Sequence, residues 1–194
     1  MPLYTSDYLK KLSRRKTVLF SQEMINENKK VHISFDIFLS HSYLDKEEVE
    51  GLYIELRSQG YSVYVDWIVD PQLNRTNVTK ESAKLIQSRL KMSKTLLLAV
   101  SINASLSKWM PWELGYVDGN TGKCAVIPVS MSSYNVPESF NGFEYLQLYP
   151  FIKKVPTTGL GEKLFVIEES RKYIIMDDWL RSNAIPKLQA INIF

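Results

Sequence analysis

Short apolar runs recur along the middle of the chain and alternate with segments in which apolar residues repeat at helical spacing. Four runs are almost continuously apolar, as strands covered on both faces of a parallel sheet tend to be; they lie at 35–39, 61–65, 95–100 and 124–129. Two amphipathic segments separate the first three runs, with apolar residues at Val49, Leu52, Tyr53 and Leu56 and at Ala83, Ile86 and Leu90. The run at 95–100 is the most apolar, so we expect it at the centre of the sheet.

This alternation of strand and helix predicts an α/β fold with a flavodoxin-like, doubly wound parallel sheet. We expect about five strands with flanking helices, the fifth strand being a short one at 143–148. We assign residues 32–150 to this domain and residues 1–31 to an N-terminal helical extension. Residues 151–194 are expected to form a C-terminal helical segment packed on the domain, because apolar residues over 162–180 repeat at helical spacing.

Cap residues mark where the helices are expected to begin and end. Asp45, followed three residues later by Glu48, predicts a helix start that resembles a capping box. Gly60 predicts the end of that helix, and Thr79 can cap the next one. The connection over 68–78 has no clear period, and long connections of this kind are usually functional or mobile.

Polar and aromatic residues gather where the strands end. Doubly wound sheets bind ligands beyond the carboxyl ends of their strands, so the connections that begin at Ser40, Asp66, Ser101 and Ser130 are expected to converge on one crevice. The candidate substrate contacts in the first two connections are Ser40, His41, Ser42, Tyr43, Asp66 and Trp67. His41 could donate a hydrogen bond to a ligand, but it fits an ordinary loop histidine equally well. Asp66 could instead cap its own loop.

Residues 105–116, which follow the central strand, contain two tryptophans and one carboxylate. If Trp109 and Glu113 are both helical, their side chains lie one turn apart on the same face and can line one crevice. Pro111 suits the first turn of such a helix. A purely structural interpretation stays open at this point, because the helix dipole stabilises an acid near a helix N-terminus and tryptophans are common in cores. Trp112 points in a different direction and is expected in the core.

Composition excludes several classes of site. The 194 residues include one cysteine and two histidines, too few for a disulfide, a thiolate cluster or a multi-histidine metal site, so we expect no metal. The net charge of +3 is slight, and we interpret the basic residues near the N-terminus as a solvated face rather than a nucleic-acid-binding arm; they are Lys10, Lys11, Arg14, Arg15 and Lys16. Neither a Gly-x-Gly-x-x-Gly motif nor a Walker loop occurs. No secretory signal or apolar run of about 18–20 residues is found, so we expect a cytoplasmic protein that does not bind membranes.

Two motifs in this order resemble those of TIR (Toll/interleukin-1 receptor) domains. Residues 35–42, Phe-Asp-Ile-Phe-Leu-Ser-His-Ser, look like the first-strand signature of that family. Residues 109–113, Trp-Met-Pro-Trp-Glu, are similar to its Trp-x-x-x-Glu segment, and 68–78 occupies the place of its BB loop. The resemblance covers roughly residues 33–150. Many members have a cysteine directly after the tryptophan, where this chain has Met110.

The resemblance implies a reaction. Catalytically active TIR domains cleave NAD+ at the nicotinamide–ribose bond, so the chain is expected to be an NAD+ glycohydrolase or cyclase. It would make an ADP-ribose-derived signal in antiviral defence, as in the anti-phage Thoeris-like systems of bacteria. Glu113 would be the catalytic residue, Trp109 and the six candidates above would contact the substrate, and no cofactor besides the substrate NAD+ would be needed.

Chemistry supports this role for one carboxylate. Nicotinamide is already a good, positively charged leaving group, and a carboxylate near the ribose can stabilise the oxocarbenium-like charge that develops. Family enzymes often complete their site across neighbouring subunits, which implies a homo-oligomer, and a downstream effector could sense the product.

Two other functions remain possible on the sequence. A non-catalytic TIR adaptor would signal by self-association, and changes within 68–78 would abolish its binding while NAD+ stayed intact. A relative of the nucleoside deoxyribosyltransferases, which use a glutamate at a ribose in a similar sheet, would exchange bases on deoxynucleosides and ignore NAD+.

Overall fold

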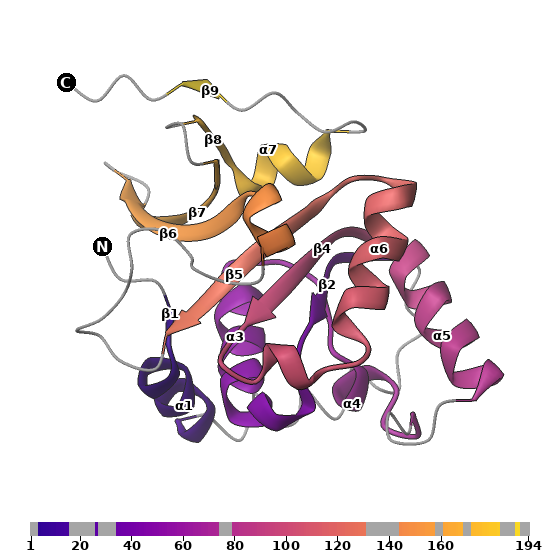
Figure 1. Ribbon diagram of the computed structural model, residues 1–194. Coiled ribbons are helices and arrows are strands. Elements are labelled where there is room, and N and C mark those ends of the chain that lie inside the picture. Colours follow the sequence, from indigo (N-terminus) through magenta and orange to yellow (C-terminus); the bar gives the residue numbers. More distant parts are fainter. Residues whose placement is uncertain are drawn as a thin grey trace.

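A parallel sheet forms the middle of the molecule in the computed structural model, which describes residues 4–15, 26, 34–73, 79–130, 144–157, 161–168, 172–182 and 189–190. The four parallel strands at its centre run in the order β3-β2-β4-β5 (Figure 1). Their bounds are β2 Phe35–Ser40, β3 Val63–Tyr64, β4 Ser93–Val100 and β5 Cys124–Ser130. The most apolar strand, β4, lies between β2 and β5, so the predicted doubly wound sheet and its central strand are confirmed.

Helices cover both faces of this sheet, each above a separate apolar core (Figure 1). Side chains alternate between the two faces along a strand, and accordingly Leu39 and Leu97 belong to one core whereas Phe38 and Leu98 belong to the other. The first core is covered by α1 (Ser6–Arg14), α3 (Lys46–Ser58) and α7 (Met176–Arg181), and the second by α5 (Lys80–Lys91) and α6 (Met110–Asn120).

Two of the predicted helix boundaries are confirmed. Thr79 caps α5 through a capping box, in which its hydroxyl accepts from the Ser82 amide and the Ser82 hydroxyl accepts from the Thr79 amide. Gly60 follows the end of α3 with a φ of 92°, a left-handed conformation that glycine adopts without strain.

The fifth strand does not lie at 143–148, as the sequence predicted. Glu144–Leu148 is a 3-10 helix, η3, and the next strand is β6, Phe151–Thr157. β6 runs parallel to β5 and pairs with it at Val126 and Phe151. The segment Phe-Glu-Tyr-Leu-Gln-Leu has alternating apolar residues over too short a stretch to distinguish a strand from a single helical turn.

The prediction of one long helix over 162–180 was also wrong. The described residues of the segment form the strands β7 (Gly161–Glu168) and β8 (Lys172–Ile175), and among them only those of α7 (Met176–Arg181) are helical. β7 runs antiparallel to β6 and pairs with it along its length, and β8 runs antiparallel to β7. Leu164 and Val166 are fully buried at a spacing of two, which is the strand period. Leu164 and Ile167 also fit a helical spacing of three, and this ambiguity led to the wrong prediction.

The N-terminal segment is part of the same fold. Tyr4–Thr5 forms β1, which pairs in parallel with Val129 and Ser130 at the carboxyl end of β5. The following helix α1 confirms the prediction of a helix in the N-terminal extension and packs on α3 (Figure 1). The packing is close, because a Cβ on Gly51 would lie 2.2 Å from the carbonyl oxygen of Leu9. Lys16 and the rest of the extension up to residue 33, Asn26 apart, lie outside the described residues.

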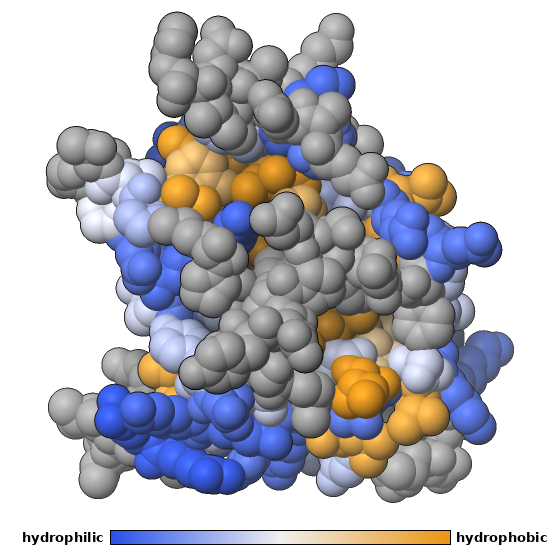
Figure 2. Space-filling view, turned by 60° about the vertical axis from the view of Figure 1, so that its left-hand side comes forward, coloured by the Kyte–Doolittle hydropathy of each residue, from blue (hydrophilic) through white to orange (hydrophobic). Residues whose placement is uncertain are grey.

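Polar contacts fix α1 in place along α3. Ser6 donates to Glu48 at 2.6 Å, Tyr8 donates to Glu55 at 2.8 Å, and Lys10 pairs with Glu48 at 3.0 Å. Figure 2 shows hydrophilic side chains along the lower edge of the molecule, where α1 lies in Figure 1, and apolar side chains gathered beside them. Among the described residues, no helix is long and apolar enough to cross a membrane.

Candidate active site

Glu113 lies in the first turns of α6, directly beyond the end of the central strand. Its side chain is completely buried, and its amide donates to the Trp109 carbonyl at 2.8 Å. Trp109 caps the helix with a helical backbone (φ −87°, ψ −39°), so the predicted one-turn spacing from Trp109 to Glu113 is present. Pro111 lies within the first turn of the helix, as predicted. A carboxylate in such a position benefits from the positive end of the helix dipole.

Ser40, the last residue of β2, holds this carboxylate. Its hydroxyl donates to Oε2 of Glu113 at 2.5 Å, in a fully buried contact between residues far apart in the sequence. Hydrogen bonds to an ionised group are short and strong. The structure thus brings together two of the residues that the sequence predicted, one from each of two adjacent connections.

Three aromatic rings follow one another along α6. Trp109 and Trp112 meet edge to face with centroids 5.4 Å apart, and Trp112 and Tyr116 lie 6.1 Å apart. Trp109 and Tyr116 are partly buried against the second core, whereas Trp112 is 36% exposed. The prediction that Trp112 belongs to the core was therefore wrong: it lies on the outer side of α6, where its ring packs on other aromatic rings.

His41, Asp66 and Trp67 form a second group. Nδ1 of His41 lies 2.7 Å from the Leu39 carbonyl oxygen, which can only accept, so Nδ1 carries the proton. Nε2 lies 3.4 Å from Oδ1 of Asp66, and the imidazole meets the Trp67 ring edge to face at 4.7 Å. Lys46 lies over the Trp67 ring at 5.9 Å. His41 is thus a buried, oriented residue and not an ordinary exposed loop histidine.

The Ser40–Glu113 pair and the His41 group lie on opposite faces of the sheet, near the carboxyl ends of its strands. Trp67 packs against the core below α3, whereas Trp109 packs against the core below α6. Ser40 and His41 are consecutive residues at the end of one strand, so their side chains point to opposite faces. The structure therefore places all the predicted residues near one edge of the sheet, with the Ser40–Glu113 pair on one side and the His41 group on the other.

Ser42 and Tyr43 differ from the other candidates. Ser42 caps the 3-10 helix η1 (Tyr43–Asp45), where its hydroxyl accepts from the Leu44 amide at 3.4 Å. Tyr43 is 62% exposed at the start of η1. A capping role accounts for Ser42, and the Tyr43 side chain is open to solvent.

The start of the connection at 68–78 is held by a short helix and by a contact with α5. Asp66–Val69 forms the short helix α4, and Asp70 after it is buried. Arg89 of α5 holds Asp70 with two hydrogen bonds of 2.7 and 2.8 Å, a paired geometry typical of arginine and carboxylate. This contact with Asp70 raises the pKa of the Arg89 guanidinium. Residues 74–78 of the predicted loop lie outside the described residues.

Sequence reasoning missed a third group, formed by Asp45, Ser101 and Asn103. Asp45 does not cap α3, contrary to the prediction of a capping box, because its carboxylate accepts from Ser101 Oγ at 2.5 Å and from Asn103 Nδ2 at 2.7 Å. Glu48, the other half of the predicted box, accepts from Ser6 instead. The two sides of this group are separated by more than fifty residues, so no local pattern in the sequence could have identified it.

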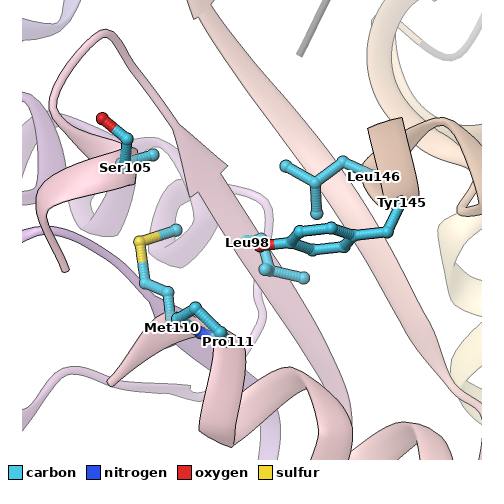
Figure 3. A pocket seen from close by; sticks show the side chains of 7 residues that line it. Leu98, Ser105, Met110, Pro111, Tyr145 and Leu146 are labelled. Carbon is cyan, nitrogen blue, oxygen red and sulfur yellow. The ribbon is translucent and has the colours of Figure 1, made fainter. Parts of the chain in front are cut away.

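A small pocket of about 70 Å³ lies on another side of the α6 N-terminus. In Figure 3 the ring of Tyr145 reaches from η3 toward Leu98 of β4, with Met110 and Pro111 of α6 nearby. Its lining is mainly apolar and consists of Leu98, Ala104, Ser105, Met110, Pro111, Tyr145 and Leu146. None of these described residues is a predicted site residue, so this pocket is distinct from the Ser40–Glu113 pair.

Within the described part of the chain, no group of three or more histidine, cysteine, aspartate or glutamate side chains could hold a metal ion. The arrangement offers instead one buried carboxylate with a hydroxyl donor, a tryptophan one helical turn before it and an oriented histidine on the opposite face. A carboxylate held in this way can stabilise a positive charge that develops nearby.

Comparison with known proteins decides the family. A family model described as "TIR domain" matches residues 37–159, which include most of the first-strand motif, the whole Trp-x-x-x-Glu segment, β2 from Ile37 onward and the strands β3 to β6. The chain belongs to the TIR domain family. The sequence-based resemblance is thereby confirmed.

Two curated relatives from bacteria match this TIR domain protein. A protein of Bacillus cereus (strain MSX-D12), named "Probable 3' cyclic ADP-D-ribose synthase ThsB'", is 45% identical over 150 residues, which are 77% of this chain and 77% of that protein. A protein of Cytobacillus dafuensis, provisionally named cyclic ADP-D-ribose synthase TIR2, is 30% identical over 91 residues, 46% of this chain and 23% of that protein.

A solved structure is also similar, the TIR domain of the Toll-related receptor TRR-2 of Hydra magnipapillata. The TM-score is 0.39 at 19% identity, over 58% of this chain and 83% of that one. At this level the likeness adds no argument beyond the family assignment.

Proposed function

We propose that this TIR domain protein cleaves NAD+ at the nicotinamide–ribose bond and makes a cyclic ADP-ribose signal in antiviral defence. The observation that carries the proposal is the buried Glu113 carboxylate held by Ser40 beyond the central strand. The 45% identical relative, named as a synthase of 3' cyclic ADP-D-ribose, supports the choice of reaction.

The chemistry needs one well-placed negative charge. As the C–N glycosidic bond breaks, its electron pair leaves with nicotinamide, which thereby becomes neutral, and positive charge develops on the ribose. Glu113 would stabilise this charge, and the carboxylate would be positioned in advance by its hydrogen bond from Ser40. The ribose carbon is then attacked by a hydroxyl group of the same molecule, which gives a cyclic product, or by water, which gives ADP-ribose; either nucleophile loses one proton.

The neighbouring residues fit substrate contacts. Trp109 presents an aromatic surface one turn before Glu113, and His41 is the oriented polar group on the other side of the edge. Since Glu113 is fully buried in the single chain, the substrate reaches it only after the surroundings rearrange. We propose that self-association provides this rearrangement and that a separate effector senses the product.

The direct test is the measurement of nicotinamide and ADP-ribose products by mass spectrometry after incubation with NAD+. We expect the wild type to release nicotinamide, more strongly at high protein concentration, and Glu113→Gln to lose at least about 100-fold in rate, because removing one charge-stabilising group costs about that much. The matched control is Glu144→Gln, a change at an exposed glutamate on η3. Equal background signals from the wild type and Glu113→Gln in dilute and concentrated protein would contradict the proposal.

A further inference from the structure

We infer that Asp45 is a positioning residue for Glu113, acting through the group of Asp45, Ser101 and Asn103, here called the Asp45 bridge. This inference rests on the proposed NAD+ cleavage. The Asp45 bridge links the connection after β2 with the connection after β4, and Glu113 lies at the far end of the second connection.

Both ends of the bridge use residues that would ordinarily cap a helix. Asp45 precedes α3 and Asn103 precedes the 3-10 helix η2 (Ala104–Leu106), yet neither side chain makes a cap hydrogen bond. Aspartate and asparagine are preferred caps because their side chains satisfy free amides at the helix start. Here both side chains bond to each other, so the contact between the two connections replaces local helix capping.

The hydrogen bonds of the bridge form a closed arrangement. Asp45 accepts from Ser101 at one oxygen and from Asn103 at the other, at 2.5 and 2.7 Å. Ser101 in turn accepts from the Asn103 amide at 2.9 Å. Asp45 is only 4% exposed, so both of its oxygens are satisfied inside the protein, and losing the donors would leave a buried carboxylate unpaired.

The bridge and the catalytic pair join the same two connections. Ser40 of β2 lies beside Leu98 of β4 in the sheet, so the connections leave from adjacent strands. One contact between them is Ser40 to Glu113, and the other is the Asp45 bridge. Loss of the bridge frees the connection after β4 to shift, which alters the position of Glu113 relative to Ser40 and to a bound ribose.

The bridge is separate from the candidate substrate contacts. Asp45, Ser101 and Asn103 face a cavity of about 350 Å³ that is also lined by Ser6 and Lys10 of the N-terminal segment. Neither Ser40 nor Glu113 is among the lining residues of that cavity. Asp45 therefore acts on the reaction through the geometry of Glu113 and not by contact with the reacting atoms.

The test uses the full chain and compares Asp45→Ala, Asp45→Asn and the control Glu47→Ala, which removes a half-exposed carboxylate two residues away. We expect Asp45→Ala to lower kcat about tenfold or more, because a displacement of about 1 Å at a reacting group can cost roughly 100-fold, while KM changes less than about threefold. Asp45→Asn keeps one acceptor oxygen and should be intermediate. Glu47→Ala should match the wild type.

A second measurement does not depend on turnover. Hydrogen exchange should be faster in both 41–45 and 101–107 for Asp45→Ala, and Ser101→Ala should add little to the effect of Asp45→Ala, because residues of one network are not additive. The inference is overturned if kcat of Asp45→Ala stays within about twofold of the wild type, or if exchange rises in only one connection. A wild type that releases no nicotinamide would contradict the proposed function, and exchange alone would then decide whether Asp45 joins the two connections.

Discussion

At the scale of single residues, the proposed chemistry depends on a carboxylate, Glu113, that is buried away from water. An ionised carboxylate is costly to bury without donors, and Ser40 supplies one to Glu113. The helix start supplies a favourable dipole as well. In the single chain, Glu113 is thus held in position by Ser40 but is covered, so under the proposed function a substrate gains access to it only after a rearrangement.

Replacing Ser40 by alanine tests this arrangement. We expect Ser40→Ala to lower the free energy of unfolding by about 1–3 kcal/mol, because a hydrogen bond to a charged group is lost inside the protein. Nicotinamide release should fall as well. The measurements are urea unfolding and the product assay, with Ser58→Ala as the control, since the Ser58 hydroxyl donates to the Glu55 carbonyl at the end of α3 and Ser58 is not a candidate site residue. Equal effects of the two changes would contradict a special role for Ser40.

The sequence was sufficient to predict that Glu113 and Trp109 lie one turn apart on a helix, because this spacing is local. It also placed Ser40 and His41 at the correct strand end. It could not predict that Ser40 bonds to Glu113 or that His41 lies beside Asp66. These contacts depend on the face of the sheet to which each side chain points at the end of β2. The Asp45 bridge was missed for a related reason: a residue type that ordinarily caps a helix was used for a distant contact.

At the scale of elements, α1 and α3 pack closely against each other at Gly51. Gly51 is required there because any side chain would meet the Leu9 backbone. The polar contacts of Glu48 and Glu55 with α1 then fix the helix along its length. The sequence predicted a helix in this segment, but the position at which it packs depends on a glycine whose role is visible only in the structure.

Gly51→Ala should therefore separate α1 from α3. We expect a loss of about 1–3 kcal/mol in the free energy of unfolding, the usual cost of overpacking, and faster proteolysis near residues 4–15. Gly119→Ala is the matched control, because Gly119 lies in α6 with open space around its Cβ position; alanine there should stabilise by about 0.5–1 kcal/mol. A Gly51→Ala protein as stable as this control would contradict the close packing.

The largest errors in predicting elements lie in the last third of the chain. The strands β2, β3, β4 and β5 were found because they lie in apolar runs that alternate with clear helical segments. The strands β6, β7 and β8 are exposed on part of their surface, and their mixed patterns also fit helical spacing over a few residues. Their pairing with each other, which no local pattern reveals, decides their structure.

At the scale of the whole molecule, buried or half-buried ion pairs join segments that lie far apart in the chain. Lys154 of β6 bonds to Glu55 of α3 at 2.8 Å and to Glu162 of β7 at 2.6 Å. Glu48 bonds to Ser6 and Lys10 of the N-terminal segment. These contacts connect α3 to the N-terminal segment and to the strands β6 and β7. Ion pairs thus link three parts of the chain that are far apart in the sequence.

Stability should consequently depend on acid pH. Burial raises the pKa of the Glu48 carboxyl, but hydrogen bonds from Ser6 and Lys10 together outweigh it and hold that pKa below the usual 4.5. Because the folded pKa is the lower one, this contribution is present above about pH 4.5 and is lost as the pH falls through the folded value. Burial and contacts with Lys94 and Ser62 act in the same way on the pKa of Asp36.

Glu48→Gln is expected to flatten this part of the pH profile. Urea unfolding of the wild type and Glu48→Gln at about pH 7 and about pH 4 should show a smaller loss of stability for the variant, since it has one fewer carboxyl to protonate. Glu81→Gln, at an exposed position on α5, is the control. An identical pH dependence of the wild type and Glu48→Gln would show that Glu48 does not contribute.

The pairing of β1 with the end of β5 has a consequence for synthesis. Tyr4 and Thr5 leave the ribosome well before their strand partners, Val129 and Ser130, which are made only after the strands β2, β3 and β4. Chains emerge at roughly 5–20 residues per second, and contacts between distant segments form slowly. β1 can therefore take its place in the sheet only after β5 has been made, so this pairing forms late relative to the synthesis of Tyr4 and Thr5.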